Sequence, residues 1–193
     1  TQSLDLSIYP LVKAWGFIDG KYTVPSAEEI EALCGNLNFS AVTVTSFTES
    51  GDYLVTAPAE TALTFGAVAR GCASGYAVAA LRASGVTSAI VSLGGNVQTL
   101  GLKPDGSSWN VAVQDPNNTG SYVGVLSVGE TAVVTSGGYQ RYFLGEDGVR
   151  YHHILDPATG YPANSGLSSV TVVCPDGLLA FHSAVHTRRR QSD

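Results

Sequence analysis

Alternating apolar and polar positions predict a chain built mainly of short β-strands. Residues 41–45 and 53–57 both alternate, and the turn residues 49–52 between them predict a β-hairpin. Further apolar runs predict strands at 88–93, 109–114, 124–128, 131–134 and 167–174, with a tight turn at Gly94-Gly95-Asn96 and a second hairpin around the turn signal 145–148. The pattern therefore favours a fold rich in antiparallel strands.

Helical signals are fewer. Ser26 and Glu29 form a capping box that predicts a short helix through about Leu33. The stretch from Gly66 to Arg82 predicts one long helix, and Pro175-Asp176 precedes a short one. One long helix among about nine short strands indicates an α+β fold with mixed or antiparallel sheets, because helices and strands do not alternate regularly.

The long helix is crowded with small residues such as Ala67, Ala69, Gly71 and Gly75. Small side chains allow either a neighbouring backbone or a flat ligand to approach closely. Amide groups at the helix start near Gly66, and in the Gly-rich turns 94–96 and 136–138, could bind an anion, although such turns are often only turns. The residues alone leave these alternatives open.

Composition excludes several function classes. The chain has 193 residues, 44% hydrophobic content and a net charge of -6, which is consistent with one globular domain. Basic residues cluster only in the tail Arg188–Arg190, so we expect no nucleic-acid partner. Cys34, Cys72 and Cys174 lie far apart, which favours buried thiols over a metal site, and no apolar run is long enough for a membrane span.

Hydrolytic chemistry finds little support in the residues. Ser136 and Thr135 are candidate nucleophiles and His152 and His153 are candidate bases, but no nucleophile elbow is present and no acid is placed to orient a histidine. Adjacent histidines in a strand point to opposite faces, so they cannot chelate one metal together. We expect one of the pair to face the core or a pocket and the other to face outward.

Four motifs in order carry a resemblance to a known family. They are Ile90–Gly101 (IVSLGGNVQTLG), Val113–Pro116 (VQDP), Val134–Phe143 (VTSGGYQRYF) and His153–Pro162 (HILDPATGYP). Together they resemble the ApbE family of FAD:protein FMN transferases, over residues 4 to about 180 and the C-terminal two thirds of such proteins. The resemblance implies a single ApbE-like domain with a T-fold-related architecture that lacks the family's N-terminal segment.

The resemblance also implies a reaction. The family moves FMN from FAD to a Ser or Thr hydroxyl of a target flavoprotein with Mg2+ and releases AMP, and some members hydrolyse FAD as pyrophosphatases. FAD is then the substrate, a flavoprotein acceptor is the partner, and an extracytoplasmic, membrane-anchored lipoprotein is the expected form, with its anchor outside this sequence. The alternative is a degenerate, non-catalytic member that binds a flavin nucleotide.

Site residues follow from the resemblance, position by position, and most of them lie outside the four motifs. Ser3-Leu4-Asp5 resembles a flavin-contacting segment, and Thr64 stands where the family has Asp before the long helix. Arg70 replaces the family's lysine, which keeps the cation but changes its geometry. Within the same run, Cys72 replaces an aromatic residue, and Ala67 would offer its backbone carbonyl to the metal. His153 and Ile154 match a contact on the flavin nucleotide.

The C-terminal end departs from the family pattern. Where the family has Asp and Thr as metal ligands, this chain has Phe181 and Val185. His182 and His186 are spaced i, i+4 on the expected helix, a spacing that suits zinc, although such a pair is often merely exposed. The sequence leaves both alternatives open.

Overall fold

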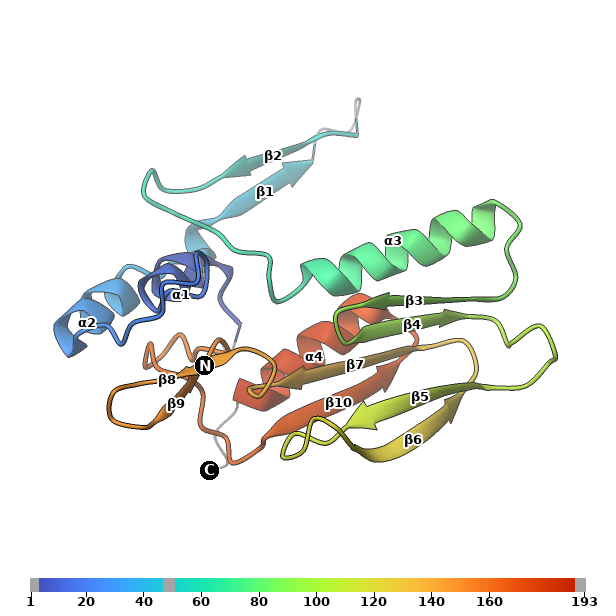
Figure 1. The fold of residues 1–193 in the computed structure, drawn as a ribbon. Helices are drawn as coiled ribbons and strands as arrows, with labels where there is room; N and C mark the ends of the chain where they lie inside the picture. Colours follow the sequence, from blue (N-terminus) through green and yellow to red (C-terminus); the bar gives the residue numbers. More distant parts are fainter. Residues whose placement is uncertain (1–3, 47–50, 190–193) are drawn as a thin grey trace. The chain divides into compact units, whose positions relative to one another are not determined.

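The computed structural model describes residues 4–46 and 51–189, and their contacts divide the chain into two compact units (Figure 1). The first unit contains the described residues up to Thr64 together with Phe143–Pro162. The second contains Phe65–Tyr142 and the described residues from Ala163 onward.

The first unit begins with short helices: η1 (Leu6–Ile8), α1 (Tyr9–Ala14), α2 (Ala27–Gly35) and η2 (Phe39–Ala41). Pro10 lies in the first turn of α1, where its missing N–H removes no intrahelical bond. Ser26 Oγ accepts a hydrogen bond from the Glu29 amide at 3.2 Å, which confirms the predicted cap of α2. The sequence pattern did not predict the helices before residue 20.

Apolar side chains from these helices form the core of the first unit. Trp15 and Phe17 are fully buried, and the remaining buried members of the cluster are Ile8, Leu11, Ile30 and Leu155. Trp15 also donates a hydrogen bond from Nε1 to the Gly160 carbonyl at 2.9 Å, which satisfies its only polar atom. This hydrogen bond links the end of α1 to the turn at residues 156–160.

Two hairpins complete the first unit. The strands β1 (Thr43–Ser46) and β2 (Tyr53–Thr56) pair antiparallel, as the alternating pattern predicted. Of the predicted turn residues 49–52, the first two lie outside the described residues. The strands β8 (Tyr142–Leu144) and β9 (Arg150–His152) form the second hairpin around the predicted turn. His152 is buried and His153 is half-buried, which agrees with the expectation that the two rings face different ways.

A four-stranded antiparallel sheet organises the second unit. Its strand order is β10 (Ser169–Cys174), β7 (Ala132–Gly137), β4 (Asn96–Leu100) and β3 (Ala89–Leu93). The helices α3 (Ala69–Ala83) and α4 (Gly177–Arg189) pack against this sheet and against each other, so they form a single layer (Figure 1). The α+β class with antiparallel sheets is confirmed.

Two predicted helices have different bounds in the structure. The long helix begins at Ala69 rather than Gly66, because residues 66–68 form a turn in which the Ala69 amide donates to the Phe65 carbonyl. The last helix, predicted to be short, runs for 13 residues. Asp176 caps it by accepting from the Leu179 amide at 2.9 Å.

Strand β4 is an inner strand of the sheet that the apolar pattern missed. Three of its residues are polar and almost fully buried: Asn96, Gln98 and Thr99. Thr99 Oγ1 lies 2.6 Å from the Gly129 carbonyl and 2.9 Å from the Thr131 carbonyl, and it accepts from the Thr131 amide. Hydrogen bonding therefore replaces apolar packing as the reason this strand is buried.

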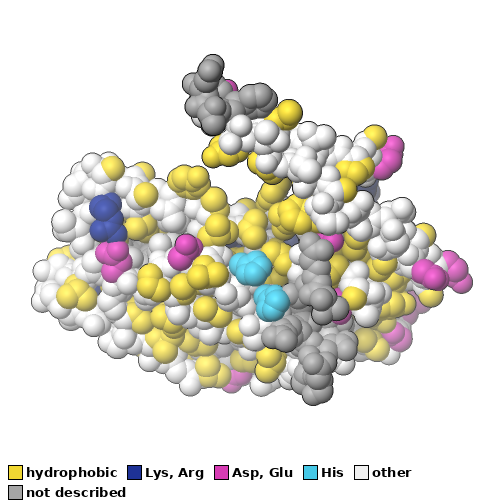
Figure 2. Space-filling view, turned by 180° about the vertical axis from the view of Figure 1, so that it is seen from behind, with side chains coloured by type: hydrophobic (Ala, Val, Ile, Leu, Met, Phe, Trp, Pro, Cys, Tyr) yellow, Lys and Arg dark blue, Asp and Glu magenta, His cyan; other side chains and the backbone are white. Residues whose placement is uncertain are grey.

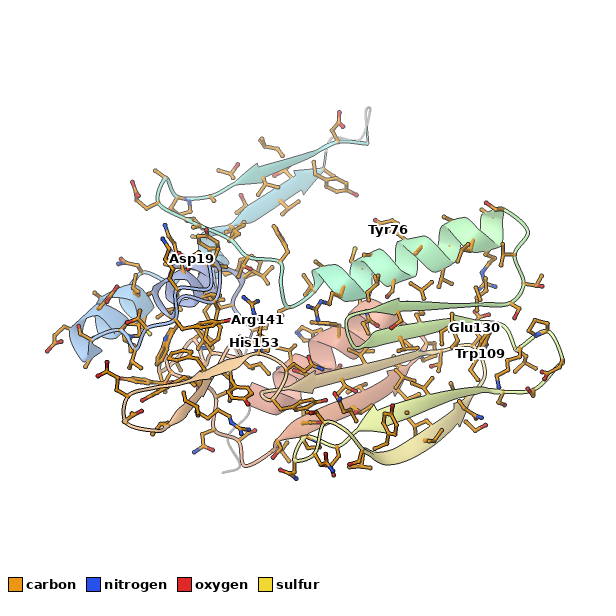
Figure 3. All side chains as sticks on the ribbon, viewed as in Figure 1. Asp19, Tyr76, Trp109, Glu130, Arg141 and His153 are labelled. Carbon is orange, nitrogen blue, oxygen red and sulfur yellow. The ribbon has the colours of Figure 1, made fainter. Side chains whose placement is uncertain are left out.

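A further hairpin of β5 (Trp109–Gln114) and β6 (Tyr122–Val128) is attached to the end of β4 at Gly101. Trp109 donates from Nε1 to the Gly101 carbonyl at 3.0 Å, and Glu130 accepts from the Gly101 amide at 2.9 Å (Figure 3). Gly101 has a φ of +58°, and an added Cβ would lie 2.1 Å from the Thr87 carbonyl oxygen. Only glycine suits this junction.

The two helices of the second unit meet at a pair of glycines. A Cβ added at Gly71 of α3 would lie 2.5 Å from the Gly177 carbonyl oxygen of α4. A Cβ added at Gly177 would lie 2.6 Å from Gln98 Oε1 of β4. Backbone approach is therefore the reason for glycine at position 71. Gly75, one turn later on α3, has no atom within 4 Å of an added Cβ.

This difference between two glycines of one helix predicts opposite effects of the same substitution. Gly71→Ala forces α3 and α4 apart and should lower the free energy of unfolding by about 1–3 kcal/mol. Gly75→Ala meets no neighbour and should raise it by roughly 0.5–1 kcal/mol, because alanine favours the helix interior. Urea unfolding followed by circular dichroism measures both, and equal effects of the two substitutions would contradict the close helix contact.

Candidate functional site

In the second unit, Arg70 lies against one of the Gly-rich turns. Gly94 and Gly95 join β3 to β4 with φ values of +56° and +92°, a left-handed pair that suits a two-residue hairpin. The guanidinium of Arg70 donates from Nη1 to the Gly94 carbonyl at 2.8 Å, and the side chain is exposed. A guanidinium has five N–H donors, so this bond holds the cation at the turn and leaves other donors available to a ligand.

The second Gly-rich turn lies beside the first. The Thr135 amide donates to the Gly95 carbonyl at 3.3 Å, and an added Cβ at Gly95 would lie 3.2 Å from Gln140 Nε2. Gln140 belongs to the loop after β7, where its amide donates to the Gly137 carbonyl at 3.4 Å. The structure therefore brings together both turns that the sequence suggested as anion-binding candidates, and Arg70 contacts the first of them.

A buried polar cluster lies where α3 faces β4. Ser74 Oγ is 2.9 Å from Gln98 Oε1 and 3.0 Å from the Gly71 carbonyl, and it accepts from Asn96 Nδ2 at 3.2 Å. Ser74 and Asn96 are fully buried. Sequence reasoning missed this cluster, because its members come from separate elements and only the polar run Asn96–Thr99 hinted at it.

Next to this cluster is an open pocket of about 590 Å³. Small residues of α3 form one wall, and the capped start of α4 forms another. The lining residues are Gly71, Cys72, Gly75, Tyr76, Ala79, Gln98 and 175–178. Tyr76 is 75% exposed and points away from the sheet (Figure 3). Of the two alternatives for the small-residue face, close backbone approach is therefore confirmed at Gly71, whereas Gly75 borders open space.

The positions at which the resemblance implies metal ligands do not fit Mg2+. Phe181 and Val185 are 9% and 6% exposed and lie with Ala180 and Ala184 on the buried side of α4. Magnesium requires oxygen ligands, and neither side chain has an oxygen atom. Ala67 is half-buried and offers its carbonyl alone. Across residues 4–46 and 51–189, no group of three or more His, Cys, Asp or Glu side chains could hold a metal ion.

The expected cysteine burial is only partly realised. Cys34, Cys72 and Cys174 are all half-buried and unpaired. Desolvation, assisted by the nearby Asp156 carboxylate, raises the pKa of the Cys34 thiol above its ordinary value. No described helix is both long and apolar enough for a membrane span.

In the first unit, the segment that begins at Leu4 is fixed by Asp5. The buried Asp5 carboxylate accepts from the Ser7 amide at 2.8 Å and from the Ser7 hydroxyl at 2.5 Å, which caps η1. The Thr64 amide donates to the Leu6 carbonyl at 2.8 Å. The structure therefore places Thr64 next to the segment of Leu4 and Asp5; Ser3 lies outside the described residues.

His153 and Ile154 lie at the edge of an aromatic cluster in the same unit. Ile154 is 4% exposed, and the His153 ring makes an edge contact with Phe17 at a centroid distance of 6.2 Å. Phe143 stacks on Tyr22 at 5.2 Å and on Tyr151 at 5.5 Å. Aromatic packing thus fixes the strand that precedes His153, and the half-buried imidazole keeps access to solvent.

A smaller pocket of about 460 Å³ adjoins this cluster, lined by Tyr22, Thr23, Val24 and 143–147. Its acidic rim is fixed by hydrogen bonds to Asp147. Tyr151 donates its hydroxyl proton to Asp147 Oδ2 at 2.7 Å, and the Val149 amide donates to Oδ1 at 3.0 Å. These donors lower the pKa of Asp147, and the same carboxylate raises the pKa of Tyr151.

Comparison with known proteins gives these residues a context. The model of a family described as the ApbE family matches residues 1–183. The chain belongs to the ApbE family. Its members named FAD:protein FMN transferase include a protein of Treponema pallidum, 37% identical over 175 residues, which are 85% of this chain and 48% of that protein. One of Klebsiella pneumoniae is 37% identical over 177 residues, 91% of this chain and 53% of that protein.

A solved ApbE structure supports the fold. The crystal structure of the ApbE protein of Thermotoga maritima matches with a TM-score of 0.84 at 32% identity, over 95% of this chain and 58% of that chain. The ApbE-like fold that the four motifs implied is therefore confirmed. This chain spans about half the length of the curated ApbE relatives that it matches.

The Asp147 contacts predict a measurable pKa change in this ApbE chain. Tyr151→Phe removes the strongest donor and should raise the pKa of Asp147 toward its ordinary value. Because the folded-state pKa is lowered, the stabilising contribution is present above the ordinary carboxyl pKa and is lost as the pH falls through the folded value. A carboxyl NMR titration of both proteins tests this, and an unchanged Asp147 titration would contradict it.

Proposed function

We propose that this chain acts as an FAD:protein FMN transferase, which moves FMN from FAD to a Ser or Thr hydroxyl of a target flavoprotein. In this reaction the hydroxyl oxygen attacks the phosphorus on the FMN side of the diphosphate. The bond from that phosphorus to the bridging oxygen breaks, AMP leaves with the bridging oxygen, and the hydroxyl proton is released. Membership of the ApbE family and the names of its relatives support the proposal.

The observation that carries the proposal is the position of Arg70. The family's lysine position here holds a cation that is exposed and fixed by its bond to the Gly94 carbonyl. Phosphoryl transfer needs positive charge on the developing oxyanions, and a guanidinium binds phosphate through paired N–H groups. We assign Arg70 to the diphosphate of FAD.

The remaining predicted contacts enter the proposal with separate roles. His153 and Ile154 are assigned to the flavin nucleotide, where a half-buried imidazole is available to donate or accept a hydrogen bond. Thr64 takes the position of the family's Asp and offers a hydroxyl in place of a carboxylate. Leu4 and Asp5 are assigned to the flavin-contacting segment together with Ser3.

The proposal assigns few ligands to magnesium. The Ala67 carbonyl oxygen is the only assigned ligand, because Phe181 and Val185 offer none. The extracytoplasmic, membrane-anchored location is likewise a proposal, and it rests on the family resemblance.

The buried apolar side chains of Phe181 and Val185 favour a second candidate function, which is nucleotide binding without transfer. A member without an Asp and a Thr at the metal site would bind FAD or FMN but would not transfer it. A third outcome, FAD pyrophosphatase activity, would use the same nucleotide contacts with water as the acceptor.

Product analysis separates these functions. Incubation of the protein with FAD and MgCl2 should release AMP, detected by liquid chromatography, and a Ser- or Thr-containing flavoprotein acceptor should gain covalent FMN. AMP with free FMN and no labelled acceptor would indicate a pyrophosphatase. Quenched FAD fluorescence without AMP would overturn both enzymatic functions and leave the nucleotide-binding one.

Substitution of Arg70 tests its assignment to the diphosphate. Arg70→Ala should weaken FAD binding about tenfold, which corresponds to roughly 1.4 kcal/mol for a charge-assisted hydrogen bond. Arg82→Ala is the matched control, because Arg82 lies on the same helix and pairs with Glu130. Fluorescence titration measures both, and equal FAD affinity of the Arg70 variant and the unmodified protein would contradict the assignment.

A further inference from the structure

The last helix presents two histidines beside its buried face. Ala180, Phe181, Ala184 and Val185 are buried, and they lie on the side of α4 that packs against the sheet. His182 and His186 each follow one of these residues and are half-buried. The imidazoles therefore reach the surface of the helix, while the two positions that correspond to the family's metal ligands face the core.

The two imidazole rings are neighbours. They are spaced i, i+4, which stacks side chains one turn apart on the same helix face. Their centroids are 5.9 Å apart, with an angle of 31° between the ring planes. Figure 2 shows two adjacent histidine side chains at the surface of the molecule. Two histidines spaced i, i+4 on one helix face are the arrangement with which known helical motifs bind zinc.

We propose that His182 and His186 form a binding site for a divalent transition-metal ion such as Zn2+, Ni2+ or Cu2+, with water in the remaining coordination positions. Imidazole nitrogen is a preferred ligand of these ions, whereas Mg2+ prefers oxygen. The helix already holds the two ligands one turn apart, which lowers the entropic cost of chelation. The site is independent of the proposed transfer reaction.

Binding at this site would stabilise the second unit. An ion bridging the two rings holds two successive turns of α4, and this helix contacts β7, β10 and α3 through its buried face. A ligand that binds only the folded state favours folding by mass action. At a free concentration 100 times its dissociation constant, it raises the ratio of folded to unfolded protein about 100-fold. Protons compete with the ion for the imidazole nitrogens, so the effect should be smaller at pH 5 than at pH 7.5.

Calorimetric titration of the whole chain with ZnCl2 and NiCl2 tests the site directly. We expect about one ion per chain with a dissociation constant in the micromolar range, and no comparable binding of MgCl2. His182→Ala and His186→Ala should each weaken binding by roughly tenfold or more, since each removes one of two protein ligands. Thr187→Ala, an exposed substitution on the same helix, should bind like the unmodified protein.

Thermal unfolding provides the second measurement. In EDTA, all three variants should unfold within a few degrees of the unmodified protein, because none of these side chains belongs to the buried core. Zinc should raise the unfolding temperature of the unmodified protein and of Thr187→Ala only. Binding that persists in both histidine variants would place the ion on other groups, such as the cysteines, and would overturn the proposal, as would no zinc binding by the unmodified protein.

Discussion

Close approach of two glycines is the constraint on which the second unit depends. Gly71 admits the backbone of α4, and Gly177 admits the Gln98 side chain of β4. With both side chains absent, two helices and an inner strand meet over the hydrogen-bonded Ser74 cluster. A larger side chain at Gly71 would collide with the α4 backbone and separate the helices, whereas one at Gly177 would displace the Gln98 and Ser74 side chains and disturb their hydrogen bonds.

The parts of the fold that the sequence predicts are those in which apolar residues are buried and polar residues are exposed, or in which a cap lies within a few residues of its helix. Strand β5 has the predicted bounds, and the Ser26 cap starts α2 as expected, because both signals lie within a few residues. Strand β4 was missed because its buried residues are polar, and their partners Ser74 and Thr131 lie more than 20 residues away in the sequence. A pattern of apolar residues cannot predict hydrogen-bond partners that lie so far apart in the sequence.

The candidate site likewise combines features that the sequence predicts with features that only the folded chain shows. The family resemblance pointed to Arg70, and the residues themselves pointed to both Gly-rich turns, yet only the folded chain brings the guanidinium to the Gly94 carbonyl. The apolar residues Phe181 and Val185, at positions where the resemblance implies oxygen ligands, were visible in the sequence, whereas their burial was not. Burial matters because a buried apolar side chain has no polar atom to hold a water molecule that could take the place of an oxygen ligand. The position assigned by resemblance to the nucleotide still holds a cation, Arg70, whereas the two positions assigned to the metal hold buried apolar side chains.

The attachment of the β5–β6 hairpin has a consequence for cooperativity. The two strands pair with each other in a separate sheet, and a side-chain hydrogen bond from Trp109 to the Gly101 carbonyl joins β5 to the end of β4. Several of its side chains are exposed, including Tyr122, Val123 and Val125. A segment with few buried contacts and its own hydrogen-bond ladder can open while the main sheet stays closed. We therefore expect the hairpin to open as a separate unit of local unfolding, while the helices and the main sheet stay folded.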